Sequence, residues 1–232
     1  LPLRNTVLFP GVVIPITVGR DKSIKLVKDA YKEKKLIGVV AQKDPDIEEP
    51  EISDLNNIGT VANIIKILQM PDGNTTVIIQ GKKRFQLQEM IQSDPYFKAR
   101  VKEFDKIENL VRNKEFKALI SSLKDLSIQI IRQSPNIPTD AAFAIKNIES
   151  PVFLVNFVSS NLNIDIAEKQ KLLEISDFHE RAQKVLFALT RELQMLELKN
   201  QIQNKVKVDL DKQQRDYFLH QQMKTIQEEL GD

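Results

Sequence analysis

The residues that could perform chemistry in this sequence are few, and their spacing favours no particular reaction. The two histidines, His179 and His220, are 41 residues apart in a stretch that we expect to be helical, which would separate them by about 60 Å in a straight helix. They cannot share a metal ion within one chain, and neither lies in an HExxH pattern. Because the chain has no cysteine, thiolate ligands, thiol nucleophiles and disulfide bonds are excluded. We expect no metal site and no bound cofactor.

Glycine spacing and acidic pairs likewise predict no active site. A phosphate-binding loop needs closely spaced glycines followed by Lys-Ser or Lys-Thr, and Gly81-Lys82-Lys83-Arg84 lacks the first glycine. We interpret this run as a turn between strands with a solvated basic edge. No GxSxG motif accompanies the serines. The pairs Glu48-Glu49 and Glu228-Glu229 lack the apolar surroundings that favour acid–base catalysis. The sequence therefore predicts no catalytic residue.

The composition is typical of a folded protein without a membrane anchor. Of the 232 residues, 41% are hydrophobic and 28% are charged, and 34 basic against 32 acidic side chains give a net charge of +2. This balance provides no general attraction to nucleic acid or to an anionic membrane. No apolar run approaches the roughly 18 residues that cross a bilayer, and no signal peptide is apparent. We expect a cytoplasmic protein with no membrane partner, and a cropped piece of a longer one because it opens at Leu1 without methionine.

Glycine is concentrated in the first part of the chain, where we expect a β-rich domain. Six of the seven glycines lie between Gly11 and Gly81 and none between Lys82 and Leu230, and glycine is typical of turns and bulges. Asp72-Gly73 between two β-branched runs predicts a hairpin. The expected strands cover residues 12–18, 36–41, 58–68, 75–80, 85–90 and 97–102, and one expected helix covers 21–35. We expect residues 1–105 to form a compact mixed sheet or a partly closed barrel.

From about residue 107 the apolar period becomes helical, which makes the expected fold class α+β. Six apolar residues share one face of a first helix that ends at Ser134-Pro135: Ile107, Leu110, Leu119, Leu123, Leu126 and Ile130. Ser150-Pro151 and Asp165 provide N-cap signals for two further helices. We expect residues 106–176 to form a helical bundle.

The last segment, residues 177–232, is expected to be one long helix. Neither Gly nor Pro occurs from Asp177 to Leu230, so a continuous helix would span on the order of 80 Å. A bundle of this size covers only part of that length, and the remainder must project or pair with another chain as a coiled coil. We assign self-association to an apolar stripe of Leu186, Leu189, Leu193, Leu196, Leu219, Met223 and Ile226. The polar stretch 199–214 would then be a solvated stalk between two packed ends; the alternative is two or three shorter helices.

Both ends of the chain resemble the Lon family of ATP-dependent proteases. The opening residues that carry the resemblance are Leu1-Pro2-Leu3-Arg4-Asn5-Thr6-Val7-Leu8-Phe9-Pro10-Gly11, with Pro15 and Val18-Gly19-Arg20. Further matches are 40–43, 58–62, Pro71-Asp72-Gly73 with Gly81 and Arg84, and 169–174. Residues 214–224 with 226–231 are similar to the helix that leads into the Lon ATPase module. The polar stretch 199–211 departs from the family and leaves continuity of the helix open.

The resemblance implies a PUA-like β domain, a helical bundle and a long helix that reaches a hexameric ATPase ring. It implies that the segment captures unfolded or tagged proteins and organises a homohexamer. The parent would be an ATP-dependent serine endopeptidase that degrades misfolded and regulatory proteins. ATP, magnesium and the serine–lysine dyad would belong to modules beyond Asp232, so this segment would not be an enzyme by itself.

Unfolded chains offer apolar side chains and free backbone, so their binding site should be an exposed apolar surface or an open strand edge. We assign substrate binding to Leu8, Phe9, Pro10, Met70 and Pro71, which fall in expected loops or strand ends; the alternative is that they plug the ends of the barrel. A different class of function is an RNA- or DNA-binding module. Its basic face would consist of Lys82, Lys83, Arg84, Lys98, Arg100 and Lys102.

Overall fold

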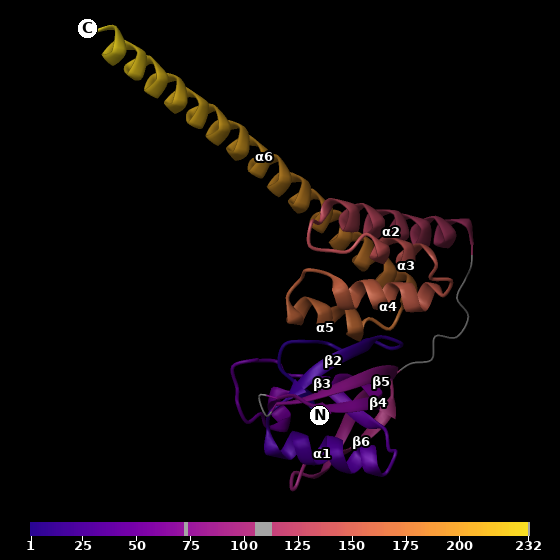
Figure 1. Ribbon diagram of the computed structural model, residues 1–232. Helices are drawn as coiled ribbons and strands as arrows, with labels where there is room; N and C mark the ends of the chain where they lie inside the picture. The colour runs from indigo at the N-terminus through magenta and orange to yellow at the C-terminus, as the bar shows by residue number, and fades with distance from the viewer. Residues whose placement is uncertain (72–73, 105–112, 232) are drawn as a thin grey trace.

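The computed structural model describes residues 1–71, 74–104 and 113–231 of the chain. Figure 1 shows a β-rich domain at the N-terminus, a helical bundle lying against it, and one helix that projects far beyond the bundle to the C-terminus. The predicted turn residues Asp72 and Gly73, and the predicted helical positions Ile107 and Leu110, lie outside the described residues. The α+β arrangement expected from the sequence is confirmed.

The β-rich domain is a bent six-stranded sheet covered by one helix. Its elements are β1 (Pro2–Leu3), β2 (Val13–Val18), α1 (Asp21–Lys32), β3 (Ile37–Ala41), the 3-10 helix η1 (Ile52–Asp54), β4 (Ile58–Gln69), β5 (Thr75–Gln92) and β6 (Lys98–Glu103). The strand order is β1-β3-β4-β5-β2, and β6 pairs with the second half of β5. All pairs are antiparallel except β1 with β3. β1 and β2 are therefore the two ends of the strand order, and no pairing between them closes the barrel within the described residues.

Strand β5 differs from the sequence prediction in an informative way. The sequence suggested two strands separated by a turn at Gly81, whereas one strand runs continuously from Thr75 to Gln92. Residues 75–80 pair with both β4 and β2, residues 81–86 continue along β4, and residues 85–92 pair with β6. The local composition of 81–84 is compatible with a turn, but cross-strand bonding to β4 on one side keeps the backbone extended. The interpretation of this run as a turn is therefore wrong.

Alternation along the strands and periodicity along α1 build the core of the β-rich domain. Val27 of α1 is fully buried, and Val77 and Ile79 point from β5 to the same cluster. Tyr31, one helical turn beyond Val27 and next to the end of α1 at Lys32, is 46% exposed. Buried residues are three apart in α1, at Val27 and Ala30, and two apart in β5, at Val77 and Ile79. These spacings match the periods of a helix and of a strand.

The helical region contains α2 (Lys114–Gln133), α3 (Asp140–Lys146), α4 (Pro151–Asn161), α5 (Ile166–Glu174) and α6 (Phe178–Leu230). The predicted caps form: the Ser150 hydroxyl accepts a hydrogen bond from the Phe153 N–H at 3.2 Å, and the Asp165 carboxylate accepts one from the Glu168 N–H at 2.7 Å. These bonds satisfy N–H groups that have no partner within the first helical turn. The short helix α3 was not predicted from the sequence.

Helix α6 is one continuous helix of 53 residues, so the alternative of several shorter helices is wrong. The Asp177 carboxylate caps it by accepting a hydrogen bond from the Glu180 N–H at 2.6 Å. Its first part packs against α2, α4 and α5, whereas every residue from 201 to 231 is exposed. Of the two packed ends that we expected, only the first one packs against this chain's own residues. Figure 1 shows the exposed part as a free rod that points away from both domains.

The two regions share one apolar core. Side chains of the β-rich domain and of the bundle belong to the same buried cluster, including Val7, Phe9, Val12, Ala41 and Ile58 from the first and Phe116, Leu123, Leu154, Leu173 and Phe178 from the second. Burial of apolar surface across this boundary stabilises the relative position of the two regions. The domain limits at residues 105 and 176 stay a prediction.

Candidate protein-binding surfaces

An apolar groove of about 610 Å³ opens on the β-rich domain between α1 and β6. Its floor is the small cluster of Val40, Leu55 and Phe85, which are 6%, 6% and 3% exposed. Large apolar side chains at its sides remain in contact with solvent, notably Leu36 at 58%, Ile91 at 64% and Val101 at 46%. Binding sites for organic ligands and peptides typically have volumes of roughly 300–1,000 Å³ and a predominantly apolar lining. The groove fits an apolar side chain or a short apolar segment.

The backbone explains why these side chains are exposed. The pairing of β5 with β6 shifts register between Leu87 and Glu89 and again between Met90 and Gln92. Such irregularities bend and twist a strand locally. Ile91 therefore lies near the end of a bent strand, where no other described strand covers it. Leu36 and Ile91 were not predicted as surface candidates, because Leu36 opens the apolar run 36–41 and Ile91 follows the end of the expected strand 85–90.

Polar groups line the rim of this groove next to the apolar residues. Desolvation raises the pKa of the Tyr96 hydroxyl, and the charge and hydrogen bond of the Asp29 carboxylate act in the same direction. The Lys98 ammonium lies 5.5 Å from the centre of the Tyr96 ring. Glu33 and Lys35 form an ion pair at 2.5 Å, and the hydrogen bond and charge of Lys35 lower the pKa of the Glu33 carboxyl. An apolar centre with a polar rim is typical of protein-binding surfaces.

The predicted substrate-binding residues do not form one surface. Leu8 and Phe9 are 3% and 0% exposed, and Pro10 is half-buried, so the expected accessibility of this segment is wrong for its two large side chains. Phe9 belongs to the core shared with the helical bundle, and Leu8 to the core beneath α1. Met70 is 45% exposed and Pro71 is also exposed, at the tip of the β4–β5 hairpin. Only the hairpin tip remains accessible to a partner.

Hydrogen bonds to main-chain carbonyls connect the β-rich domain to the bundle. Arg84 of β5 is 3% exposed, and its Nη1 donates to the carbonyl oxygens of Leu173 and, at 2.7 Å, of Ile175. These carbonyls lie at the C-terminal end of α5, where the helix dipole favours a cation. The Arg84 guanidinium also lies 5.0 Å from the centre of the Phe104 ring. Arg84 therefore acts as a buried link between the two regions, not as part of a solvated basic edge.

Two amides provide further links between the regions. Gln170 of α5 donates to the Ile58 carbonyl at 3.0 Å, and Asn156 of α4 donates to the Pro10 carbonyl at 3.0 Å. Both donors are almost fully buried. Within the β-rich domain, Gly81 allows the segment that carries Phe9 to lie close against β5, because a Cβ at this position would lie 2.3 Å from the Phe9 carbonyl oxygen. The sequence contained no signal for these pairs, since their partners are distant along the chain.

The basic face required for nucleic-acid binding is interrupted. Arg84 is buried, Lys83 pairs with Glu103 at 3.0 Å, and Arg100 pairs with Glu89 at 3.0 Å. Alternating acidic partners reduce the potential that attracts phosphate groups. The structure therefore does not support the nucleic-acid alternative.

The predicted self-association stripe divides into two parts along α6. Leu189 is 4% exposed, and Leu186, Leu193 and Leu196 pack against the core of the bundle. This first part therefore has its partners within the chain, which corrects its assignment to self-association. In the second part Leu219, Met223 and Ile226 are 51%, 56% and 56% exposed. These three lie on the projecting rod with no packing partner among the described residues.

Chemistry-bearing groups form no cluster in the part of the chain that the structure describes. Within these residues, no group of three or more His, Asp or Glu side chains could hold a metal ion. His179 lies beside the Phe116 ring, with centroids 6.5 Å apart, whereas His220 is exposed on the projecting part of α6. No helix in the described ranges is both long and apolar enough to cross a bilayer.

Comparison with known proteins identifies the family. Residues 1–191 match the family model of the ATP-dependent protease La (LON) substrate-binding domain. The chain therefore belongs to this family, and the resemblance found at its two ends is confirmed. It is 60% identical over 231 residues to the Lon protease of Flavobacterium johnsoniae and 52% identical over 232 residues to that of Cytophaga hutchinsonii. Both comparisons cover 100% of this chain and 28% of the relative.

Solved structures share the fold. The N-terminal domain of a Mycobacterium avium complex Lon protease aligns with a TM-score of 0.67 and 20% identity, covering 82% of this chain and 96% of that one. A Lon N-terminal domain protein from Xanthomonas campestris aligns with a TM-score of 0.57 and 18% identity, covering 80% and 94%. At these identities the likeness concerns the fold alone.

Proposed function

We propose that this chain is the substrate-recognition and oligomer-organising segment of an ATP-dependent serine protease of the Lon type, which degrades misfolded and regulatory proteins. The observation that carries the proposal is the apolar groove between α1 and β6, with Leu36, Ile91 and Val101 exposed at its sides. Unfolded or tagged proteins expose apolar segments that folded proteins bury. Such segments gain free energy by entering the groove because apolar surface leaves water on both partners.

Met70 and Pro71 are proposed as a second, smaller contact for the same polypeptides. Both are exposed at the hairpin tip. Leu8 and Phe9 are not part of this proposal, since Leu8 is buried in the core of the β-rich domain and Phe9 in the core shared with the bundle.

The projecting part of α6 is proposed to organise a homohexamer in the cytoplasm. Leu219, Met223 and Ile226 repeat at steps of four and three and are exposed, a pattern typical of one side of a coiled coil. ATP, magnesium and the peptidase residues belong in this proposal to modules outside the chain, and the chain alone has no enzymatic activity. The polar residues 199–211 then act as a solvated spacer between the bundle and these modules.

The groove is tested by binding of fluorescein-labelled, reduced and carboxymethylated lactalbumin, measured by fluorescence anisotropy. The substitution Ile91→Glu places a charge in the apolar groove and should weaken binding about tenfold, since loss of one large apolar contact costs about 1.5 kcal/mol or more. Ile65→Glu is the matched control, because Ile65 is 45% exposed and does not line the groove. If both variants and the unmodified chain bind lactalbumin with equal affinity, the groove assignment is contradicted. If the unmodified chain does not bind lactalbumin, the proposed function is contradicted.

A further inference from the structure

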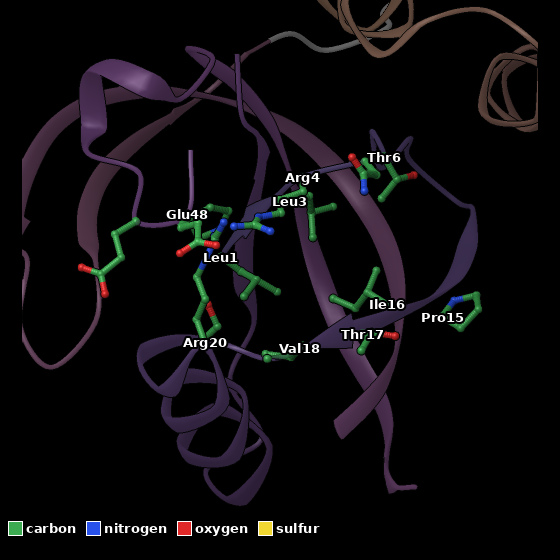
Figure 2. A pocket seen from close by; sticks show the side chains of 15 residues that line it. Leu1, Leu3, Arg4, Thr6, Pro15, Ile16, Thr17, Val18, Arg20 and Glu48 are labelled. Atoms are coloured by element: carbon green, nitrogen blue, oxygen red, sulfur yellow. The ribbon is translucent and has the colours of Figure 1, made fainter. Parts of the chain in front are cut away.

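The β-rich domain has a second cleft, of about 580 Å³, where the strand order ends without closing. Figure 2 shows Pro15, Ile16 and Thr17 of β2 on one wall, opposite the segment that carries Leu3 and Arg4. Both β1 and β2 end the strand order, so each has a bonded neighbour on one side only. The cleft is therefore bounded by two strand edges rather than by two packed faces.

The hydrogen-bond pattern defines which backbone groups of β2 face this cleft. The Gly81 N–H donates to the Val12 carbonyl at 2.9 Å, so this carbonyl points toward β5, whereas the Val12 N–H donates to the Phe9 carbonyl at 3.2 Å. Bonded and non-bonded pairs alternate along an antiparallel ladder. The pairs of Ile14 with Ile79 and of Ile16 with Val77 are then bonded ones, and those of Val13, Pro15 and Thr17 are not.

The backbone groups of Val13, Pro15 and Thr17 consequently point away from β5, and those of Pro15 and Thr17, which line the cleft, face into it. Proline at the middle position agrees with this assignment, because a residue without an N–H is tolerated on the free side of an edge strand. The outer edge thus offers the N–H groups of Val13 and Thr17 and the carbonyls of all three residues. Outside the pairing of β2 with β5, none of these groups has a backbone hydrogen-bond partner among the described residues.

The opposite wall carries a second set of outward groups. The carbonyls of Leu1 and Leu3 accept hydrogen bonds at 3.1 and 2.8 Å from the N–H groups of Val40 in β3 and of Gln42 directly after it. Although β1 and β3 are parallel, successive residues of a strand still direct their backbone groups to opposite sides, so the Pro2 carbonyl between them faces away from β3, toward the cleft. The floor is apolar, since Ile16, Val18 and Leu3 are 7%, 4% and 7% exposed and belong to the core beneath α1. Backbone groups at the sides and a closed apolar floor suit an extended polypeptide.

Charges at the rim balance one another. Arg20 is held by the structure, since its Nη2 donates to Gln42 Oε1 at 2.6 Å and to the Ile47 carbonyl at 3.4 Å. Burial lowers the pKa of Arg20 and the charge of Arg4 lowers it further, whereas Glu49 and Glu48 raise it. Two arginines and two glutamates leave the rim without net charge. Recognition here would depend on backbone hydrogen bonds and not on the sequence of the bound segment.

From these observations we infer that the cleft between β1 and β2 binds an extended, uncharged segment of another polypeptide, which adds to the free edge of β2 as a further strand. Strand addition is an established way for a domain to recognise extended peptides. Residues 13–17 offer an edge of about 17 Å, at roughly 3.4 Å per residue. This inference rests on the proposed function and adds to it a second mode of contact, through backbone instead of apolar side chains.

The test uses the 232-residue chain and a fluorescein-labelled ten-residue peptide of threonine, serine and valine with no net charge. Thr17→Pro removes one outward N–H from β2 without removing a bond to β5, and Thr17→Val keeps that N–H and is the matched control. A second peptide of the same sequence is N-methylated at its central residues, so that it keeps its side chains and loses its donors. Thermal unfolding of both variants checks that they fold.

We expect the peptide affinity of Thr17→Val to lie within twofold of that of the unmodified chain, and the affinity of Thr17→Pro to be at least about tenfold lower. The N-methylated peptide should bind the unmodified chain more weakly by a similar factor. The inference is overturned if the two variants bind equally, or if the unmodified chain binds both peptides alike or neither. The second comparison decides the matter if Thr17→Pro does not fold. If the peptide results are negative but Ile91→Glu still weakens lactalbumin binding, this inference alone is overturned. If the unmodified chain does not bind lactalbumin at all, the proposed function is overturned.

Discussion

Replacing Arg84 by methionine should loosen the connection between the β-rich domain and the helical bundle. The side chain is 3% exposed, and its Nη1 donates to two carbonyl oxygens at the end of α5, those of Leu173 and Ile175. Methionine keeps most of the aliphatic volume but offers no donor. Arg84→Met therefore removes the hydrogen bonds and the contact of the cation with the Phe104 ring while keeping most of the aliphatic packing, and it leaves two acceptors without this donor.

The magnitude follows from the hydrogen bonds that are lost. Each hydrogen bond from a charged donor contributes about 1.5–3 kcal/mol to stability, and two of them set an upper limit of about 6 kcal/mol. Water can reach part of the α5 terminus once the arginine is gone, so we expect a loss of about 3 kcal/mol in the free energy of unfolding. For a chain of this size each kcal/mol lowers Tm by about 2–4 °C, which gives a decrease of about 6–12 °C.

Differential scanning calorimetry measures this effect directly. We expect the unmodified chain to unfold with its two regions coupled through the shared core, and Arg84→Met to lower Tm and separate the two transitions. Lys82→Met is the matched control, because Lys82 is exposed on the same strand and exposed substitutions usually change stability by less than about 0.5 kcal/mol. If Arg84→Met unfolds within 2 °C of Lys82→Met, roughly the effect of 0.5 kcal/mol, Arg84 does not link the two regions.

Three further substitutions or truncations test other parts of the structure. Gly81→Ala should lower Tm by several degrees, because its Cβ would lie 2.3 Å from the Phe9 carbonyl oxygen, whereas Gly19→Ala, with nothing within 4 Å, should leave the same melting curve nearly unchanged. Asp177→Ala should cost about 1 kcal/mol in urea unfolding by removing the N-cap of α6; an unchanged midpoint would show that the cap is dispensable. Truncation after residue 200 should preserve Tm, since residues 201–231 are exposed, and light scattering coupled to size exclusion should show lost self-association. The same number of protomers per particle before and after truncation would contradict the role of the projecting helix.

Local signals allowed much of this fold to be predicted from the sequence. The caps at Ser150 and Asp165 were predictable because each bond joins residues three apart. The continuous α6 was predictable because no Gly or Pro interrupts it. Strands flanking the hairpin were predictable from their β-branched composition.

Features that depend on distant contacts were not predictable in the same way. The environment of Arg84 depends on carbonyls 89 and 91 residues further along the chain, and the charge of its neighbours Lys82 and Lys83 suggested a solvated surface. Leu186 and Leu193 have the spacing of a coiled coil, but the same spacing serves a helix that packs within its own bundle. The exposure of Ile91 results from register shifts in the pairing of β5 with β6, which composition does not reveal.

Hydrogen exchange measured by mass spectrometry tests the central claim, that the groove between α1 and β6 takes apolar segments of unfolded polypeptide. The amides of residues 86–92 and 97–103 are compared in the 232-residue chain with and without reduced, carboxymethylated lactalbumin. We predict slower exchange in both segments when lactalbumin is bound, and unchanged exchange in residues 201–230. Unchanged exchange in the two groove segments, with protection confined to the helical bundle or to residues 201–230, would contradict the claim.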